Sequence, residues 1–296
     1  MQIVEILQQQ PILLLIVVGV MGALVGSFLN VVIYRLPLML QRDWQQQCTL
    51  FQAQAQDIMS RLQTLPERYN LFLPGSTCSH CQQPIKPWDN LPILSYLLLR
   101  GKCRHCQENI TWRYPAIELF AVLLSLMVAW QFGWDGSMLA ALFFTWLLLA
   151  MSVIDIDEQI LPDHLTLSLL WLGLLLSVFD VFIPSTTAIL GAAAGYLTLW
   201  LVAAVFKLIT GKDGMGHGDF KLLAALGAWL GWQLLPLVVI VSSLLGLVVG
   251  VSSLLIKRQQ LSTAIPFGPY LAVAGWISLL WGPDILSWYL HLAGLN

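Results

Sequence analysis

Charged residues are scarce in this sequence. Of its 296 residues, 10% are charged and 58% are hydrophobic, and the mean hydropathy is +0.76. An ordinary soluble domain has about 25% charged residues, and a disordered chain has few hydrophobic ones. The composition excludes both classes and predicts a protein embedded in a lipid bilayer. The formal net charge of −2 provides no basic field, so we expect no nucleic-acid partner.

Apolar runs fill most of the chain, and a helix needs about 20 apolar residues to cross a bilayer. A transmembrane β-barrel would show short alternating segments instead. We therefore predict an all-α polytopic membrane protein with about eight transmembrane helices. The tail 284–296 is too short to cross and is expected at the interface. The predicted spans, of which the sixth is short, are 12–34, 114–132, 137–154, 164–183, 187–209, 219–232, 234–256 and 266–282.

Positive charges are distributed unevenly: nine of the 14 Lys and Arg residues lie between the first two predicted spans. If the short run 219–232 is counted as a span, the other five fall on the same side of the membrane. The positive-inside rule makes that side cytoplasmic and places both termini outside. No Lys or Arg precedes the first run, so we expect a retained helix instead of a cleaved signal peptide.

This pattern divides the chain into three parts. We predict a first transmembrane helix at 1–34, a cytoplasmic insert at 35–113 and a seven-helix membrane core at 114–296. Within the insert, apolar residues recur at steps of four and three from Trp44 to Leu65, and glutamines fill the other face. This periodicity predicts an amphipathic helix packed on the membrane surface or on its own domain. A coiled-coil partner is the alternative, but three heptads are marginal.

Cysteine is rare, and four of the five cysteines form two CxxC pairs in the insert. The pairs are Cys78 with Cys81 and Cys103 with Cys106. Two such turns can aim four thiolates at one tetrahedral Zn²⁺ ion. Disulfides are the alternative, but they do not persist in the reducing cytoplasm. We predict a closed structural zinc site, with Cys48 left over and inert.

Two aspartates are expected near the cytoplasmic membrane surface, where carboxylates are costly and point to function. Asp155 ends the third span and Asp219 opens the sixth. Two nearby carboxylates cannot both ionise easily, so one can accept a proton from water while the other polarises a peptide carbonyl. The pair suggests an aspartic protease. Gly216 and Gly218 would let a substrate strand approach the backbone.

Other interpretations remain open from the residues alone. Acidic groups at span ends often only face water, as we expect for Asp157, Glu158 and Asp163. Glu118, one turn inside the second span, is expected to reach the interface or to be paired. A polytopic transporter with an aspartate proton relay would also use such carboxylates, although we detect no internal repeat. A zinc-bearing assembly scaffold would explain the cysteines but not Asp155 and Asp219.

Several motifs together resemble a known family. They are 26–37 (GSFLNVVIYRLP), the two CxxC pairs, Asp155 followed by Leu161-Pro162-Asp163, and 216–221 (GHGDFK). In combination they resemble the type IV prepilin leader peptidases that also N-methylate their product. The resemblance covers nearly the whole chain, apart from about 40–70, which carries none of the motifs.

The resemblance implies an activity and its residues. Asp155 and Asp219 match the catalytic aspartates, with Gly216, Gly218 and Pro162 supporting the site, and the four cysteines match a zinc-binding set. The substrates would be type IV prepilins or type II secretion pseudopilins at the bacterial inner membrane. Their leaders would be cut after a glycine on the cytoplasmic side.

The resemblance alone implies the second activity, methylation of the new N-terminal residue. Gly101 and Lys102 match positions linked to methyl transfer, and S-adenosylmethionine would be the donor. The sequence contains no strand, glycine-rich turn and helix of the kind that normally binds this cofactor.

Overall fold

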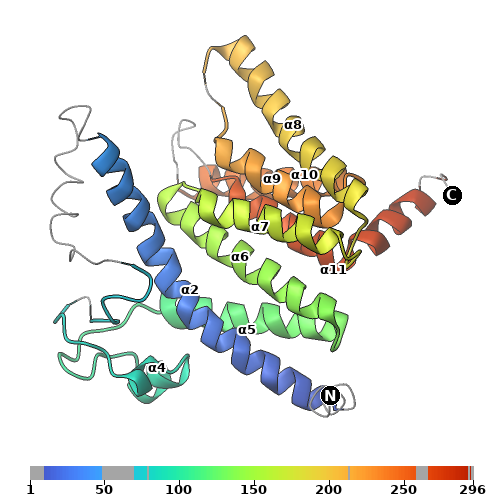
Figure 1. The fold of residues 1–296 in the computed structure, drawn as a ribbon. Helices are drawn as coiled ribbons and strands as arrows, with labels where there is room; N and C mark the ends of the chain where they lie inside the picture. The colour runs from blue at the N-terminus through green and yellow to red at the C-terminus, as the bar shows by residue number, and fades with distance from the viewer. Residues whose placement is uncertain are drawn as a thin grey trace. The chain divides into compact units, whose positions relative to one another are not determined.

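The computed structural model describes residues 10–48, 70–78, 80–212, 214–257, 266–292 and 294. These residues contain no strand, only two isolated β-bridges. The prediction of an all-α polytopic membrane protein is confirmed (Figure 1). The helices, with one 3-10 turn (η1), are α2 (Pro11–Cys48), η1 (Pro87–Asn90), α4 (Leu94–Leu98), α5 (Arg113–Phe132), α6 (Gly136–Glu158), α7 (Asp163–Ser177), α8 (Ser185–Thr210), α9 (His217–Leu230), α10 (Leu235–Lys257) and α11 (Gly268–Leu292).

Each of the eight predicted spans corresponds to a helix, but the count of eight crossings is approximate. In the described part of the chain, six helices are long and apolar enough to cross a membrane: α2, α5, α6, α8, α10 and α11. The other two, α7 with 15 residues and α9 with 14, are shorter than a full crossing. The fourth predicted span, 164–183, is interrupted because α7 ends at Ser177.

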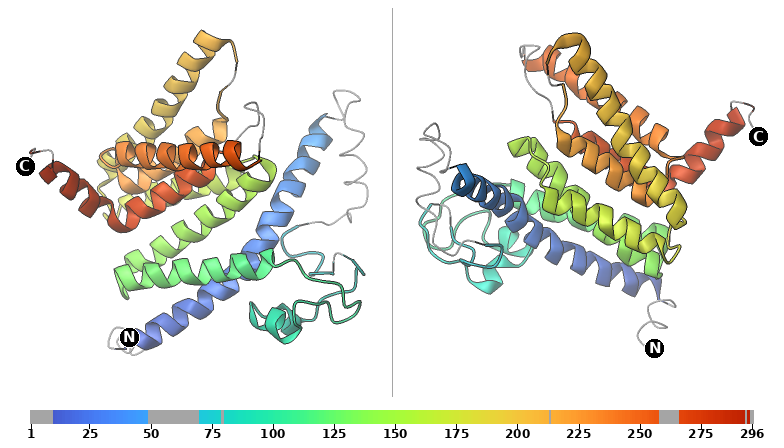
Figure 2. Two further views of the ribbon diagram at one scale, coloured as in Figure 1. Left: turned by 180° about the vertical axis from the view of Figure 1, so that it is seen from behind. Right: turned by 45° about the horizontal axis from the view of Figure 1, so that its top comes forward.

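Two further expectations concern the ends of helices. The amphipathic helix predicted at 44–65 lies outside the described residues from residue 49 onward, and its first five residues are the end of α2. The predicted tail 284–296 is, as far as residue 292, a continuation of the last helix. Pro283 lies inside α11, which changes direction along its length (Figure 2). A proline removes one helical hydrogen bond and commonly bends a helix at such a position.

The chain divides into two compact units, Met1–Trp134 and Asp135–Asn296. In the first unit, α2 packs against α5 through small residues. Gly22 lies against Ser125 and Ala121, and Gly26 lies against the backbone of Glu118. A methyl group on either glycine would come within about 3 Å of these neighbours. Small residues of this kind let membrane helices approach closely.

In the second unit, α9 is the central helix, with contacts to α7, α8, α10 and α11. Every residue from Leu222 to Leu230 is buried. A helix that is apolar on all sides is stable only inside a bundle. Because its neighbours enclose it, α9 does not have to reach both membrane surfaces, and this explains how a helix of about 21 Å fits a bilayer core of about 30 Å.

Helices α8 and α9 approach each other closely through glycines. Gly191 and Gly195 of α8 face the backbone of Gly227 and Leu223 on α9. A Cβ atom on Gly191 would collide with the carbonyl of Gly227, and one on Gly227 would collide with the carbonyl of Gly191. The collisions involve backbone, which cannot move aside as a side chain can. Glycine is therefore required at both positions.

We predict that Gly227→Ala lowers the stability of the protein in detergent micelles by about 1–3 kcal/mol, because the added methyl group forces α8 and α9 apart. Thermal unfolding measured beside Gly136→Ala provides the test. No atom lies within 4 Å of a Cβ built on Gly136, so this control is expected to melt like the parent. Equal melting temperatures for the two variants would contradict the close α8–α9 packing.

Candidate active site and metal centre

Asp155 lies in the last turn of α6 and is only 5% exposed. Its Oδ2 atom accepts a hydrogen bond of 3.0 Å from the backbone N–H of Gly268. Gly268 is the first residue of α11, so the carboxylate sits at a helix N-terminus. The free N–H groups and the positive end of the helix dipole both favour a negative charge there. The Gly268 N–H and the helix terminus therefore favour a negative charge on Asp155, against the cost of burying that charge.

Asp219 lies in the first turn of α9 and is 7% exposed. The backbone N–H of Gly216, the N-cap residue, donates to its carboxyl group. Among the described residues, its Oδ1 atom has no hydrogen-bond partner. A buried oxygen without a donor is costly to keep ionised. Asp155 and Asp219 are close enough to interact electrostatically, so the two predicted residues are brought together.

Leu161 packs against the start of α9, which carries Asp219, and against the start of α11, whose first residue binds Asp155. Its side chain lies 2.8 Å from a Cβ atom built on Gly218 and 3.1 Å from one built on Gly268. Pro162, which is buried and extended, follows it and caps α7. The loop after α6, the start of α9 and the start of α11 therefore meet around one leucine. Gly218 is small enough to let this leucine pack beside Asp219.

Asp163 was expected only to face water, and this interpretation is wrong. Its two carboxylate oxygens accept hydrogen bonds of 2.6 and 2.8 Å from Lys221 Nζ. The pair is partly exposed, so its contribution to stability is small. Its position matters more, because it ties the start of α7 to the first turn of α9, next to Asp219.

Gly268 is the site residue that sequence reasoning missed. Its Cβ atom would lie 2.6 Å from Asp155 Oδ2, so a side chain there would displace the carboxyl group. The available signal was Gly268-Pro269 at the start of the last apolar run. A Gly-Pro pair at that point marks a helix start. Nothing in the sequence connects this helix start with Asp155.

The four predicted cysteine ligands meet in the first unit. The sulfur atoms of Cys78, Cys81, Cys103 and Cys106 all lie within 4.8 Å of one another. The Sγ atoms of Cys78 and Cys106 are 3.9 Å apart, and a tetrahedral Zn²⁺ with bonds of about 2.3 Å requires about 3.8 Å. The cluster therefore fits one zinc ion.

The two halves of the cluster are built alike. In the first, the N–H of Cys78 donates to Gln83, and that of Ile85 donates to Ser76. In the second, the N–H of Cys103 donates to Glu108, and that of Ile110 donates to Gly101. The N–H groups of Cys81 and His80 lower the pKa of the Cys78 thiol to about 7, which favours the thiolate that metal requires.

Gly101, predicted to be linked to methyl transfer, opens the second half of the cluster. It is buried, has φ of +70°, and donates its N–H to the carbonyl of Tyr96. A Cβ atom there would lie 3.0 Å from the Tyr96 ring. Lys102 beside it is exposed and forms an isolated bridge with Asn109. Both residues lie in the first unit and the aspartate pair in the second.

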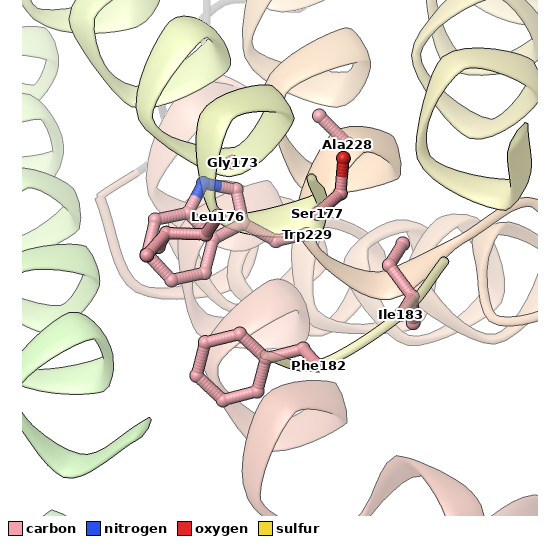
Figure 3. Close-up of a pocket in the computed structure, with 7 residues that line it drawn as sticks. All are labelled: Gly173, Leu176, Ser177, Phe182, Ile183, Ala228 and Trp229. Carbon is pink, nitrogen blue, oxygen red and sulfur yellow. The ribbon is translucent and has the colours of Figure 1, made fainter. Parts of the chain in front are cut away.

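A shallow apolar hollow with almost no enclosed space lies between α7 and α9, lined mainly by Gly173, Leu176, Phe182 and Trp229 (Figure 3). It is near the last turns of both helices, whereas Asp163 and Asp219 lie in their first turns. Trp229 closes it by donating its ring N–H to the carbonyl of Leu169. Ligand sites span about 300–1,000 Å³ and need polar groups, so this hollow does not fit S-adenosylmethionine.

Comparison with known proteins agrees with this arrangement. A bacterial peptidase A24 N-terminal domain matches residues 20–132, and the type IV leader peptidase family matches residues 142–251. The first match contains the cysteine cluster and the second contains Asp155 and Asp219. No solved structure matches the chain. The fold and these matches define a polytopic membrane peptidase.

Similarity to individual proteins extends over the whole chain. The prepilin leader peptidase/N-methyltransferase of Stutzerimonas stutzeri is 51% identical over 99% of each chain. The protein of the same name from Pseudomonas aeruginosa is 50% identical over 100% of each chain. That of Neisseria gonorrhoeae is 50% identical over 88% of this chain and 87% of its own. The chain belongs to the prepilin leader peptidase/N-methyltransferase family.

We predict that the purified protein contains about one zinc ion per chain, and that Cys103→Ser removes most of it because three thiolates hold the ion less tightly. Elemental analysis of protein in detergent measures the metal. Cys48→Ser is the matched control, since Cys48 belongs to neither CxxC pair. Zinc retained by Cys103→Ser, or lost equally from Cys48→Ser, would contradict the assignment.

Proposed function

We propose that this chain is an aspartic endopeptidase that removes the leader from type IV prepilins or type II secretion pseudopilins by cleavage after a glycine, and then N-methylates the new N-terminal residue. The observation that carries the peptidase proposal is the meeting of two buried aspartates, Asp155 and Asp219, from the ends of different helices. Full-length similarity to enzymes named for both activities supports the pairing of cleavage with methylation.

The different surroundings of the two aspartates support different roles for them, one as the general base and the other as the general acid. Asp155, with its Gly268 N–H donor, is the charged partner and takes a proton from a water molecule. Asp219, with an unpartnered oxygen, carries the proton and donates it to the carbonyl oxygen of the peptide bond. The water oxygen bonds to the carbonyl carbon. When the C–N bond breaks, the nitrogen receives the proton that Asp155 had taken, and Asp219 recovers its proton from the tetrahedral intermediate.

Location follows from the charge pattern. We place the protein in the bacterial inner membrane, with the insert 35–113 cytoplasmic and both termini periplasmic, because this arrangement puts every Lys and Arg on the cytoplasmic side. The division into a first helix at 1–34, the insert and a core at 114–296 belongs to the same proposal. Zinc would be structural, since four thiolates leave no open coordination position. S-Adenosylmethionine supplies the methyl group when bound.

We predict that Asp155→Asn and Asp219→Asn each lower the rate of prepilin cleavage by about 100-fold or more, because neither amide can exchange a proton. The assay uses purified protein in detergent and a prepilin substrate. Asp180→Asn is the control, because Asp180 is exposed beyond the end of α7. Cleavage retained by either active-site variant would remove that aspartate from the mechanism. Cleavage retained by both would exclude the pair as the catalytic site, and no cleavage by the folded parent would favour a transporter or a scaffold.

We predict that Gly268→Ala lowers kcat for cleavage, because its methyl group would displace the Asp155 carboxylate from its donor. The loss of kcat is expected to exceed the loss caused by a similar decrease in stability elsewhere in the same helix. Gly282→Ala, on the same helix, is the matched control: its Cβ atom would press on Leu234, at 2.8 Å. Both variants are expected to melt earlier than the parent, but only Gly268→Ala should lose catalytic rate. Equal kcat for the two variants would separate Gly268 from the site.

We predict that Gly101→Ala reduces methylation of the cleaved product and leaves cleavage intact. The left-handed backbone and the Tyr96 ring both resist a side chain at this position, at a cost of about 1–2 kcal/mol for the backbone alone. Mass spectrometry of the processed pilin measures both reactions. Gly75→Ala, with no atom within 4 Å of its Cβ, is the control. Loss of zinc and of cleavage together would indicate unfolding and contradict a role in methylation.

A further inference from the structure

The described part of the insert carries an exposed apolar surface. It consists of Trp88, Leu91, Leu94, Leu97 and Leu98, all of which are exposed. The leucines at 94, 97 and 98 share one side of α4, since residues three and four apart are neighbours on a helix. Leu98 is 81% exposed, and α4 has no buried residue. An apolar patch of this kind outside a membrane span marks an interaction site.

A hydrogen bond fixes the depth of this surface relative to α5. The backbone N–H of Ile93, the residue before α4, donates to Glu118 Oε2 at 2.8 Å. Glu118 is buried a little more than one turn inside α5, which begins at Arg113. At 1.5 Å per residue, Glu118 lies about 7 Å beyond the start of that transmembrane helix.

Two details of the same contact support this depth. Glu118 also accepts a hydrogen bond from Ser27, which lies well inside the apolar part of α2. Ile93 has φ of +59°, which a β-branched residue rarely adopts. The chain therefore turns sharply at the point where α4 begins, beside two membrane helices. Interfacial helices bury their apolar face about 5–10 Å into the boundary of headgroups and acyl chains.

The surroundings of the surface have the composition of a membrane interface. Trp112, 73% exposed, immediately precedes α5, and the Lys86 ammonium lies 5.7 Å from the centre of the Trp88 ring. Arg100 and Lys102 follow α4 and are exposed. Tryptophan prefers the headgroup level, and basic side chains beside it attract anionic lipids. The charge and the depth thus both indicate lipid as the occupant.

We propose that α4 and the segment before it form an interfacial anchor, which inserts Leu94, Leu97 and Leu98 into the bilayer boundary beside α5. The anchor holds the four-cysteine cluster at the membrane surface, because Gly101 and Cys103 follow α4 directly. The proposal concerns a contact with lipid and does not depend on the enzyme activity. Glu118 and Ile93 set its depth, and the surrounding basic residues face the headgroups.

A photoreactive side chain tests the occupant directly. The full-length chain, with p-benzoylphenylalanine in place of Leu98, is reconstituted in nanodiscs of phosphatidylethanolamine and phosphatidylglycerol and irradiated. Mass spectrometry is expected to find lipid adducts at position 98. The same group in place of Gln107, an exposed polar residue that directly follows Cys106, should give no lipid adduct. Adducts of residue 98 with peptides of this chain or of a second copy, or no adduct, would overturn the proposal.

Amide hydrogen exchange gives a second measurement that needs no unnatural residue. In nanodiscs, Leu97→Asp combined with Leu98→Asp is expected to speed exchange of residues 94–99 about tenfold or more, because aspartate is expelled from the lipid boundary. Gln107→Asp should leave that exchange unchanged. The zinc content of each variant shows whether the cluster is intact. Unchanged exchange in the double variant with zinc retained would mean that α4 is not in lipid.

Discussion

The hydrogen bond from the Gly268 N–H to Asp155 is the contact on which the aspartate pair depends. A carboxylate buried at the end of a membrane helix must receive a donor or remain neutral. The first N–H of α11 supplies that donor without adding a competing charge. Because a side chain at 268 would press on Asp155 Oδ2, the contact requires glycine. Asp155 is therefore held in place by backbone, which cannot change rotamer.

The second aspartate depends on the burial of α9. This helix is too short to cross a bilayer by itself, and its neighbours enclose it along its length. Glycines allow α8 to approach its backbone, and Trp229 binds its far end to α7. With so little freedom in the helix, Asp219 keeps a fixed position near Asp155. A rigid helix start, with one carboxyl oxygen that has no partner among the described residues, is suited to carrying a proton toward a substrate.

The first unit is stabilised in a different way, because the described part of the insert has little apolar core. Two similar turns of backbone bring four cysteines into a cluster that fits one zinc ion, and a bound ion would replace the missing core. Glu118 adds a second attachment by binding the backbone before α4. A buried glutamate in a membrane helix is costly, and two hydrogen-bond donors offset that cost. Glu118 is therefore paired, as one of the two sequence-based expectations had it, and the backbone of the insert is one of its partners.

Sequence reasoning identified what local chemistry specifies. Among the described residues, hydropathy located each of the six helices long and apolar enough to cross a membrane, because a bilayer demands long apolar runs. The CxxC spacing located the cysteine cluster, because each turn is local. The two aspartates stood out because charge is rare in membrane helices. The same reasoning missed the end of α7 at Ser177 and the continuation of α11 beyond Pro283, since helix ends depend on neighbouring helices.

The remaining features required tertiary structure. The sequence by itself determined the helical membrane class, and it predicted which four cysteines meet and which two aspartates form the proposed catalytic pair. Only the fold decided that Gly268 would hold Asp155, that Lys221 would pair with Asp163, and that Asp219 would keep an oxygen without a partner. Those contacts join residues far apart in the chain, such as 155 and 268. No sequence period encodes them, because they depend on how α6, α7, α9 and α11 pack together.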